Sequence, residues 1–350
     1  MSQPVILEVA VNGATRRAQN PNVPITPDEI AADCIACIAA GATIVHHHDD
    51  PRAFPESGPA GMAALSHATF SQIQAARPEA LMYPTANFAG ATVADRWDHH
   101  RILNDAGLLR LALVDPGSVN LGGTAADGTP TGSFVYIHTF DDIRYKLDAC
   151  RDLGLAPSIA IYEPGFLRTI LAYHHAGLLP AGAMVTFYFS SGTPLFGFPP
   201  TSWALDAYLM MLTGSHLPWA VAVLGGDVIA SGVARDALDA GGHLRVGLED
   251  YCGNDTPSNV ELVRRAVALC AEARRPLASS AQAEQILGLP PRSVTSVRHL
   301  GPSPRSATSV CHLGPPHRSV TRSDGPGEHG NGSRRWPRDL LVPGWFGSGC

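Results

Sequence analysis

Two patterns of apolar and polar residues alternate along most of the chain. Short apolar runs are separated by longer segments in which apolar residues recur at the spacing of an α-helix. Because strands are short and buried, the apolar runs predict strands. We expect them over Ile6–Val11, Thr43–His48, Leu81–Thr85, Leu109–Leu113, Pro157–Ile161, Met184–Phe189, Trp219–Leu224 and Leu244–Leu248.

Each predicted strand is followed by a segment with helical character. The first segment begins clearly, because Thr26 can cap it, Pro27 suits the first helical position and Glu29 can complete a capping box. Gly41 is a typical helix end. Helices are predicted over Pro27–Ala40, Met62–Ala76, Val93–Ala106, Asp141–Asp152, Leu167–Ala176, Ser202–Leu212, Asp227–Ala240 and Ser258–Arg274.

Eight strand–helix units fit one domain. Strands that alternate with helices at this spacing run parallel, with the helices as crossover connections. Eight such units within residues 1–289 predict an α/β fold, a (βα)8 TIM barrel. A doubly wound open sheet is the alternative, but Val11–Ala14 lacks the Gly-rich turn that often follows its first strand.

Residues 290–350 have a different character. The stretch Arg292–Pro302 recurs as Arg305–Pro315, in a repeat rich in Pro, Ser and Arg with neither helical nor strand periodicity. Such a composition predicts a disordered C-terminal tail.

Composition and charge narrow the class of protein. Hydrophobic residues make up 45% of the 350 residues and charged residues 16%, which is typical of a globular chain. The net charge is −6, and the segment after Pro290 holds eight arginines against three acidic residues. The domain before it is therefore strongly acidic, which argues against nucleic acid as a partner. We expect neither a membrane span nor a signal peptide, and seven scattered cysteines suit reduced thiols in the cytoplasm.

A run of three histidines ends the second predicted strand. Side chains alternate faces along a strand, so His46 and His48 should share one face while His47 points toward the helices. At the C-terminal end of a barrel strand, the inward pair would face the usual active-site mouth. Two imidazoles at this spacing can bind one metal ion, which needs a further ligand such as a carboxylate.

A pair of acidic residues ends the eighth predicted strand. Glu249 and Asp250 follow Arg245 by four and five residues. One carboxylate at a barrel mouth can bind a metal while the other accepts a proton, with the arginine holding the base ionised and oriented. The alternative is a helix-capping acid beside a surface ion pair.

Other candidates carry weaker signals. Gly225 and Gly226, after the seventh strand, could offer backbone N–H groups to a phosphate, or form an ordinary turn. Ser118 and Asn120, after the fourth strand, could hold a substrate carboxylate. Cys34 and Cys37 have the spacing of a redox pair but lie within a predicted helix, which favours buried packing. The pairs His99–His100 and His174–His175 are expected at the surface of helices.

Together these motifs resemble the β-keto acid cleavage enzyme family, typified by 3-keto-5-aminohexanoate cleavage enzyme. The resemblance covers about residues 5–289, and it depends on the order and spacing of several motifs. They are Thr26–Ile30, Ala40–His48, Gly117–Asn120 and Arg245–Asp250.

The resemblance implies a zinc-dependent (βα)8 barrel, usually a homo-oligomer such as a dimer or tetramer. Family members convert a β-keto acid and acetyl-CoA into acetoacetate and a new acyl-CoA. The roles that carry over are zinc ligation by His46, His48 and Glu249, and action of Asp250 as the base with Arg245 as its partner.

The sequence departs from the family pattern in three places. Where the family has a pair of hydroxyl residues after the third strand, only Thr85 keeps a hydroxyl here. Asp49–Asp50 replaces the Arg-Asp that often follows the second histidine. The aminohexanoate enzyme has an acidic residue after strand one to hold the substrate amine, whereas Asn12–Arg17 has none. We therefore expect a different β-keto acid as substrate.

Three other functions compete with this interpretation. A Schiff-base aldolase needs a lysine at a strand end, but the only lysine, Lys146, lies in a predicted helix. A metal-dependent hydrolase would normally add histidines from later strands, yet the fifth and sixth strands end in Tyr162–Glu163 and Phe189–Ser190. The third alternative is a relative of the family that binds a metal but catalyses no reaction.

Overall fold

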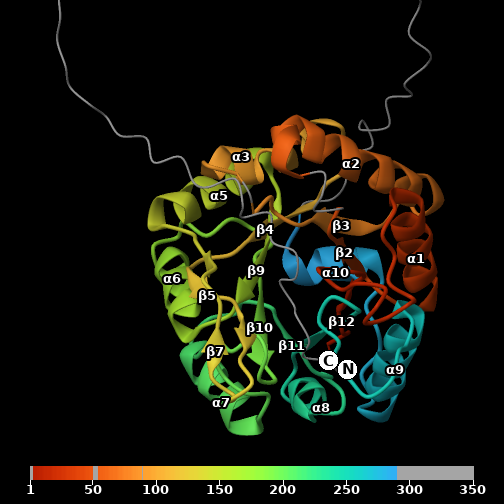
Figure 1. Ribbon diagram of the computed structural model, residues 1–350, viewed down its shortest axis with the longest axis vertical. Helices are drawn as coiled ribbons and strands as arrows, with labels where there is room; N and C mark the ends of the chain where they lie inside the picture. The colour runs from red at the N-terminus through yellow and green to blue at the C-terminus, as the bar shows by residue number, and fades with distance from the viewer. Residues whose placement is uncertain (1–2, 50–53, 89, 290–350) are drawn as a thin grey trace, which may run out of the picture. The chain divides into compact units, whose positions relative to one another are not determined.

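The computed structural model describes residues 3–49, 54–88 and 90–289 (Figure 1). The predicted tail, 290–350, and Asp50 lie outside the described residues. All eight predicted strands are present, and their ends lie within a few residues of the expected ones. They are β1 (Leu7–Ala10), β2 (Ile44–His47), β3 (Leu81–Pro84), β4 (Leu111–Val114), β9 (Ala156–Ile161), β10 (Met184–Ser190), β11 (Trp219–Leu224) and β12 (His243–Val246).

These strands form one parallel sheet that curls into a nearly closed barrel. Neighbours follow the order β3-β2-β1-β12-β11-β10-β9-β4, and β3 also lies against β4. Strand β1 is central to the site, because its registered pairs are Glu8 with Arg245 on one side and Ala10 with His46 on the other. The expected TIM-barrel fold is confirmed, and the open-sheet alternative is wrong.

Helices surround the barrel, as Figure 1 shows. Thr26 caps the first of them through a capping box with Glu29, as predicted. The helices are α1 (Pro27–Ala40), α2 (Phe54–Ala76), α3 (Val93–Trp97), α4 (His99–Asp105), α5 (Phe140–Leu153), α6 (Pro164–His175), α7 (Ser202–Met211), α8 (Val233–Asp239), α9 (Asn259–Glu272) and α10 (Ser280–Leu287).

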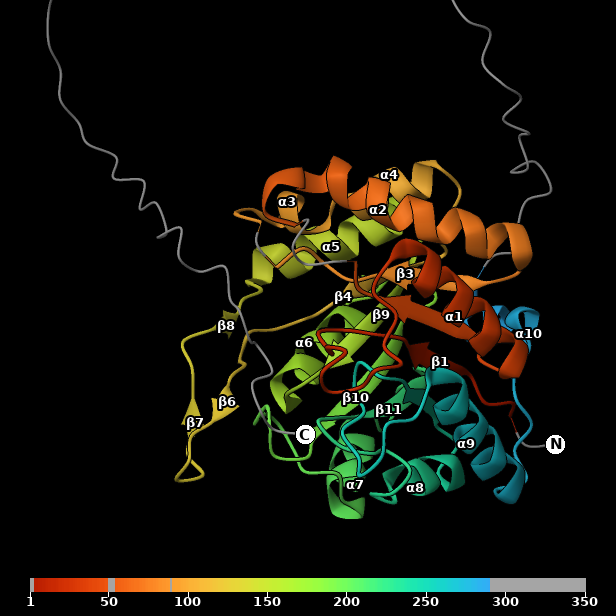
Figure 2. The ribbon, with the colours of Figure 1, turned by 45° about the vertical axis from the view of Figure 1, so that its right-hand side comes forward.

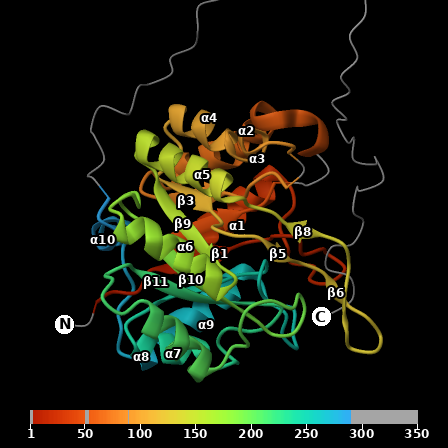
Figure 3. The same cartoon turned by 90° about the vertical axis from the view of Figure 1, so that its left-hand side faces the viewer.

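The two ends of the barrel differ. Helix α10 was not predicted; its Ala283 and Leu287 pack with Ile6, Ile44 and Leu81 inside the barrel and close the N-terminal end. At the opposite end, the chain between β4 and α5 forms two antiparallel strand pairs that project away from the barrel (Figures 2 and 3). The pairs are β5 (Val119–Asn120) with β8 (Val135–Tyr136), and β6 (Gly123–Thr124) with β7 (Pro130–Thr131).

Three predicted helices differ clearly from their expected form. Helix α2 begins at Phe54 rather than at Met62. The helix predicted over 93–106 is split at Asp98, which ends α3 and begins α4. The helix predicted from Asp227 begins only at Val233, because the Asp227 carboxylate accepts backbone hydrogen bonds from Ile229 and Ala230 and so forms a turn.

The expectation that His99 and His100 lie at the surface is wrong. Both are fully buried, because α4 packs against α2. A backbone carbonyl near each ring, that of Thr85 for His99 and that of Trp97 for His100, offers a hydrogen-bond partner.

Cys34 and Cys37 are buried free thiols within α1, which agrees with packing rather than redox chemistry. Cys150 and Cys270 are buried free thiols as well. In the described part of the chain, no helix is both long and apolar enough to cross a membrane.

Candidate active site

The three histidines at the end of β2 point in alternate directions, as predicted. His46 Nδ1 lies 3.1 Å from the Tyr83 carbonyl oxygen. Since a carbonyl can only accept, Nδ1 carries the proton and the lone pair of His46 lies on Nε2. His48 points to the same side, with its ring centroid 5.2 Å from that of His46. His47 faces outward, where its Nε2 lies 3.2 Å from Asp49 Oδ1.

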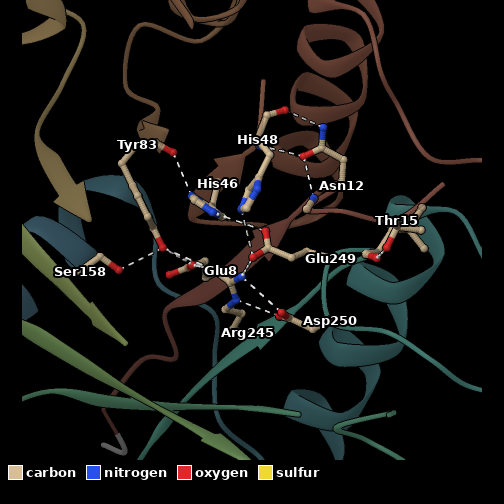
Figure 4. A network of polar contacts seen from close by, with 12 residues as sticks. Glu8, Asn12, Thr15, His46, His48, Tyr83, Ser158, Arg245, Glu249 and Asp250 are labelled. Carbon is tan, nitrogen blue, oxygen red and sulfur yellow. Dashed lines mark hydrogen bonds and ion pairs between the residues drawn. The ribbon is translucent and has the colours of Figure 1, made fainter. Parts of the chain in front are cut away.

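Glu249, three residues beyond β12, faces both inward histidines. Its Oε2 lies 3.4 Å from His46 Nε2, and its Oε1 lies 3.3 Å from His48 Nε2 (Figure 4). One ligand atom from each of the three residues lies within 4.8 Å of the others. Among the described residues, Glu249 Oε2 is buried without a hydrogen-bond partner.

This arrangement fits a metal ion better than it fits hydrogen bonds. The lone pair of His46 faces a carboxylate oxygen, which is unfavourable unless a cation lies between them. Two imidazoles and a glutamate are a donor set that zinc uses in catalytic sites, with one position left for water or substrate.

Charges at the site keep these groups in the forms a metal needs. Burial lowers the pKa of His46 well below its usual range, so the ring is neutral at pH 7. Burial alone would raise the pKa of Glu249, but His48, Arg245 and His46 outweigh it and hold that pKa well below its usual range. A neutral imidazole and an ionised carboxylate are the binding forms.

Residues after β1 position the ligands. Asn12 Nδ2 donates to the His48 carbonyl at 2.8 Å, and its Oδ1 accepts from the His48 N–H at 2.8 Å. Gly13, at φ +53°, lies directly against Glu249, since a Cβ at this position would be 2.3 Å from Glu249 Cγ. The turn that contains Thr15 is also held in place, because the Thr15 hydroxyl donates to the Leu248 carbonyl at 2.6 Å.

Arg245 connects the acidic residues of the site. Its guanidinium lies 2.8 Å from Asp250 Oδ2, 2.9 Å from Glu249 Oε1 and 2.7 Å from Glu8 Oε1. The arginine is 2% exposed. The same Glu8 oxygen accepts from the Tyr83 hydroxyl at 2.6 Å. One buried cation therefore compensates three carboxylates, which fixes their geometry.

Asp250 has the properties of a general base. Burial, together with the nearby charge of Glu249, raises its pKa to about 6 against the opposing effect of Arg245. A carboxylate with a raised pKa accepts a proton more readily than an ordinary aspartate does. Both Arg245 and Asp250 line one cavity of the molecule.

Sequence reasoning missed Glu8 and Tyr83. A signal was present, because Glu8 interrupts the apolar run of the first strand and a buried carboxylate needs a partner. Tyr83 contributes both its carbonyl, near His46, and its hydroxyl, which accepts from Ser158 at 3.0 Å.

The predicted substrate-binding residues lie in different environments. Thr85 is buried just after β3, and its N–H donates to the His47 carbonyl at 3.0 Å. Ser118 is exposed, and its hydroxyl exchanges hydrogen bonds with the His138 backbone. Asn120 is exposed on β5, where it pairs with Val135.

The two glycines after β11 are in a tight turn beside Asp250. Gly225, at φ +73°, donates its N–H to the Asp250 carbonyl at 3.0 Å. That N–H already makes a hydrogen bond within the protein, which argues against a role in binding a phosphate. Gly226 lines the same cavity as Asp250.

A TIM barrel with a candidate metal centre at the C-terminal ends of its strands, beside a buried arginine–aspartate pair, is the architecture of a metal-assisted enzyme. Comparison with known families makes the class specific. The family model described as beta-keto acid cleavage enzyme matches residues 4–289, and the chain belongs to this family.

Several relatives align over nearly their whole length. The 3-oxoadipate:acetyl-CoA acetyltransferase of Cupriavidus necator is 29% identical over 300 residues, covering 83% of this chain and 96% of the relative. The 3-keto-5-aminohexanoate cleavage enzyme of Fusobacterium nucleatum is 27% identical over 306 residues, covering 83% and 99%. Among solved structures, apo ObcA shares the fold with a TM-score of 0.59 at 16% identity, over 77% of this chain and 66% of that chain.

Proposed function

We propose that the chain is a zinc-dependent acyltransferase that converts a β-keto acid and acetyl-CoA into acetoacetate and a new acyl-CoA. The observation that carries the proposal is the placement of His46, His48 and Glu249 beside the Arg245–Asp250 pair. The names of the two enzyme relatives support it, since each names a β-keto acid and one of them also names acetyl-CoA.

His46, His48 and Glu249 would hold the zinc ion. When bound there, zinc would polarise the keto group of a β-keto acid and make the adjacent α-protons more acidic. The chain supplies a neutral imidazole, an ionised carboxylate and a rigid support from Asn12 and Gly13.

Asp250 removes the α-proton in this proposal. The proton passes from the α-carbon to a carboxylate oxygen of Asp250, and Arg245 keeps that carboxylate oriented. The resulting carbon nucleophile attacks the thioester of acetyl-CoA and releases CoA. CoA then attacks the former keto carbon, and cleavage of the carbon–carbon bond gives acyl-CoA and acetoacetate, which takes the proton back.

Other residues have supporting roles. Thr85 is the candidate for a hydroxyl contact with the substrate. Ser118 and Asn120 are candidates for its carboxylate, and Gly226 for a contact with CoA. A cytoplasmic location and a dimer or tetramer stay predictions.

The experiment that tests the proposal uses purified, zinc-loaded protein with acetyl-CoA and a panel of β-keto acids. We expect acetoacetate only when both substrates are present. Product that forms in water without acetyl-CoA would favour the metal-dependent hydrolase instead. No turnover with any acid, in a protein that binds zinc, would favour the non-catalytic relative.

A further inference from the structure

Asp115 places a further buried carboxylate inside the barrel mouth. Leu111, on β4, belongs to the cluster that fills the barrel interior, and Leu113 packs against that cluster. Because side chains alternate along an extended chain, Asp115 follows Leu111 and Leu113 in the inward-facing row. It is 2% exposed.

A set of residues from the segment after β4 fixes Asp115 in place. The Tyr136 hydroxyl donates to Asp115 Oδ2. The ammonium group of Lys146, the only lysine of the chain, donates to the Asp115 backbone carbonyl at 3.0 Å. It also lies 3.2 Å from His138 Nδ1, which therefore accepts, so the ring proton of His138 lies on Nε2.

Two polar atoms of this cluster are left without a partner. Among the described residues, neither Asp115 Oδ1 nor His138 Nε2 makes a hydrogen bond, although both are buried. His138 Nε2 lies 3.8 Å from Asp115 Oδ2, too far for a normal hydrogen bond. Leaving a buried carboxylate oxygen unsatisfied costs free energy, so a partner for Oδ1 is expected when the site is filled.

Aromatic rings connect this cluster to the candidate metal centre. The Phe88 ring lies 6.0 Å from His48 and 5.4 Å from Tyr136, measured between ring centroids. The Tyr162 ring lies 6.4 Å from the Tyr136 ring, also measured between ring centroids. A row of ring contacts therefore runs from His48 through Phe88 to Tyr136, whose hydroxyl binds Asp115.

We propose that Asp115 recognises a hydrogen-bond donor, a hydroxyl or an ammonium group, on the acyl chain of the β-keto acid. This inference rests on the proposed function, in which the keto group lies at His48 and Glu249. The acyl chain is then the part of the substrate that can extend along the Phe88 and Tyr136 rings. The stretch after β1 has no acidic residue to bind such a group, and Asp115 supplies one after β4.

The test compares three β-keto acids of equal length with acetyl-CoA present: 3-oxohexanoate and its 5-hydroxy and 5-amino derivatives. We expect the wild type to prefer at least one donor-bearing acid by about 10- to 100-fold in kcat/KM, the worth of a hydrogen bond to a charged group. Asp115→Ala should remove that preference and leave kcat/KM for 3-oxohexanoate within about threefold. Asp105→Asn, at an exposed acid on α4, should change neither.

Asp115→Asn identifies the donor, because it keeps the shape and loses the charge. If Asp115→Asn still prefers the 5-hydroxy derivative over 3-oxohexanoate, the group that Asp115 binds is a hydroxyl. If Asp115→Asn loses a preference for the 5-amino derivative, that group is an ammonium. Equal loss for all three acids in Asp115→Ala, or no preference in the wild type, would overturn the proposal.

If the wild type turns over none of the acids, the proposed function fails, and calorimetric binding of the same acids to zinc-loaded protein tests the subsite by itself. The subsite is supported if a donor-bearing acid binds the wild type more tightly than 3-oxohexanoate does, and if Asp115→Asn or Asp115→Ala removes that difference in affinity. Equal affinities contradict it.

Discussion

The contact between Gly13 and Glu249 gives a prediction with a matched control. An alanine Cβ at position 13 would lie 2.3 Å from Glu249 Cγ, 2.9 Å from its Cβ and 3.1 Å from its Cα. Carbon atoms pack at about 3.5 Å or more, so Gly13→Ala must displace Glu249 by about 1 Å. The positive φ of +53° adds about 1 kcal/mol of backbone strain for alanine.

Gly177→Ala is the control, because Gly177 has a φ of +68° and no atom within 4 Å of the added Cβ. It should cost about 1 kcal/mol of the free energy of unfolding and leave metal affinity unchanged. Gly13→Ala should cost about 2–4 kcal/mol, strain plus overpacking. Its zinc affinity should fall about 10- to 100-fold, as when the support of a metal ligand is removed.

The assay is a zinc titration against a competing chelator, with thermal unfolding measured on the metal-free proteins. Zinc affinity of Gly13→Ala equal to that of the wild type would show that Glu249 does not bind the metal from this position. An equal loss in Gly177→Ala would show that strain alone, rather than the contact with Glu249, lowers the affinity.

Three further predictions follow from the same structure. His46→Ala and His48→Ala should lower bound zinc severely while His47→Ala should not, and metal analysis showing equal loss in all three would contradict the alternation along β2. Burial raises the pKa of Asp33 to about 6, so wild-type stability should fall as the pH rises from about 4 through 6. Asp33→Asn should therefore be more stable than wild type by about 1–3 kcal/mol at pH 8 and lose that advantage at pH 4, measured by denaturant unfolding. Removing residues 290–350 should leave folding and zinc binding unchanged, and insoluble or metal-free protein would refute this.

Local patterns in the sequence predicted the fold and the inward direction of His46 and His48. Both depend on regularities that act over a few residues: apolar runs, capping residues and the alternation of side chains on a strand. The histidine run was informative because β2 keeps a regular extended form up to His47.

The surroundings of the site required knowledge of which strands are neighbours. Glu8 meets Arg245 only because β1 pairs with β12, and a sequence separation of 237 positions hides that contact in the sequence. Asp115 was missed because it begins a long connection without strong periodicity, and its partners Tyr136 and Lys146 lie 21 and 31 residues further along the chain. His99 and His100 were misplaced since two adjacent polar residues on a helix are typical of a surface, whereas α4 buries both.

The most direct test of the account is exchange of substrate α-protons with deuterated water, followed by NMR on zinc-analysed protein. Asp250→Asn should keep its zinc and slow exchange by a factor of about 10²–10⁴, because only the proton acceptor is lost. Glu249→Gln should lose zinc and exchange together, and Arg245→Met should resemble Asp250→Asn. Exchange at the wild-type rate in zinc-loaded Asp250→Asn, or loss of zinc from Asp250→Asn but not from Glu249→Gln, would contradict the assignment of the base and the ligand.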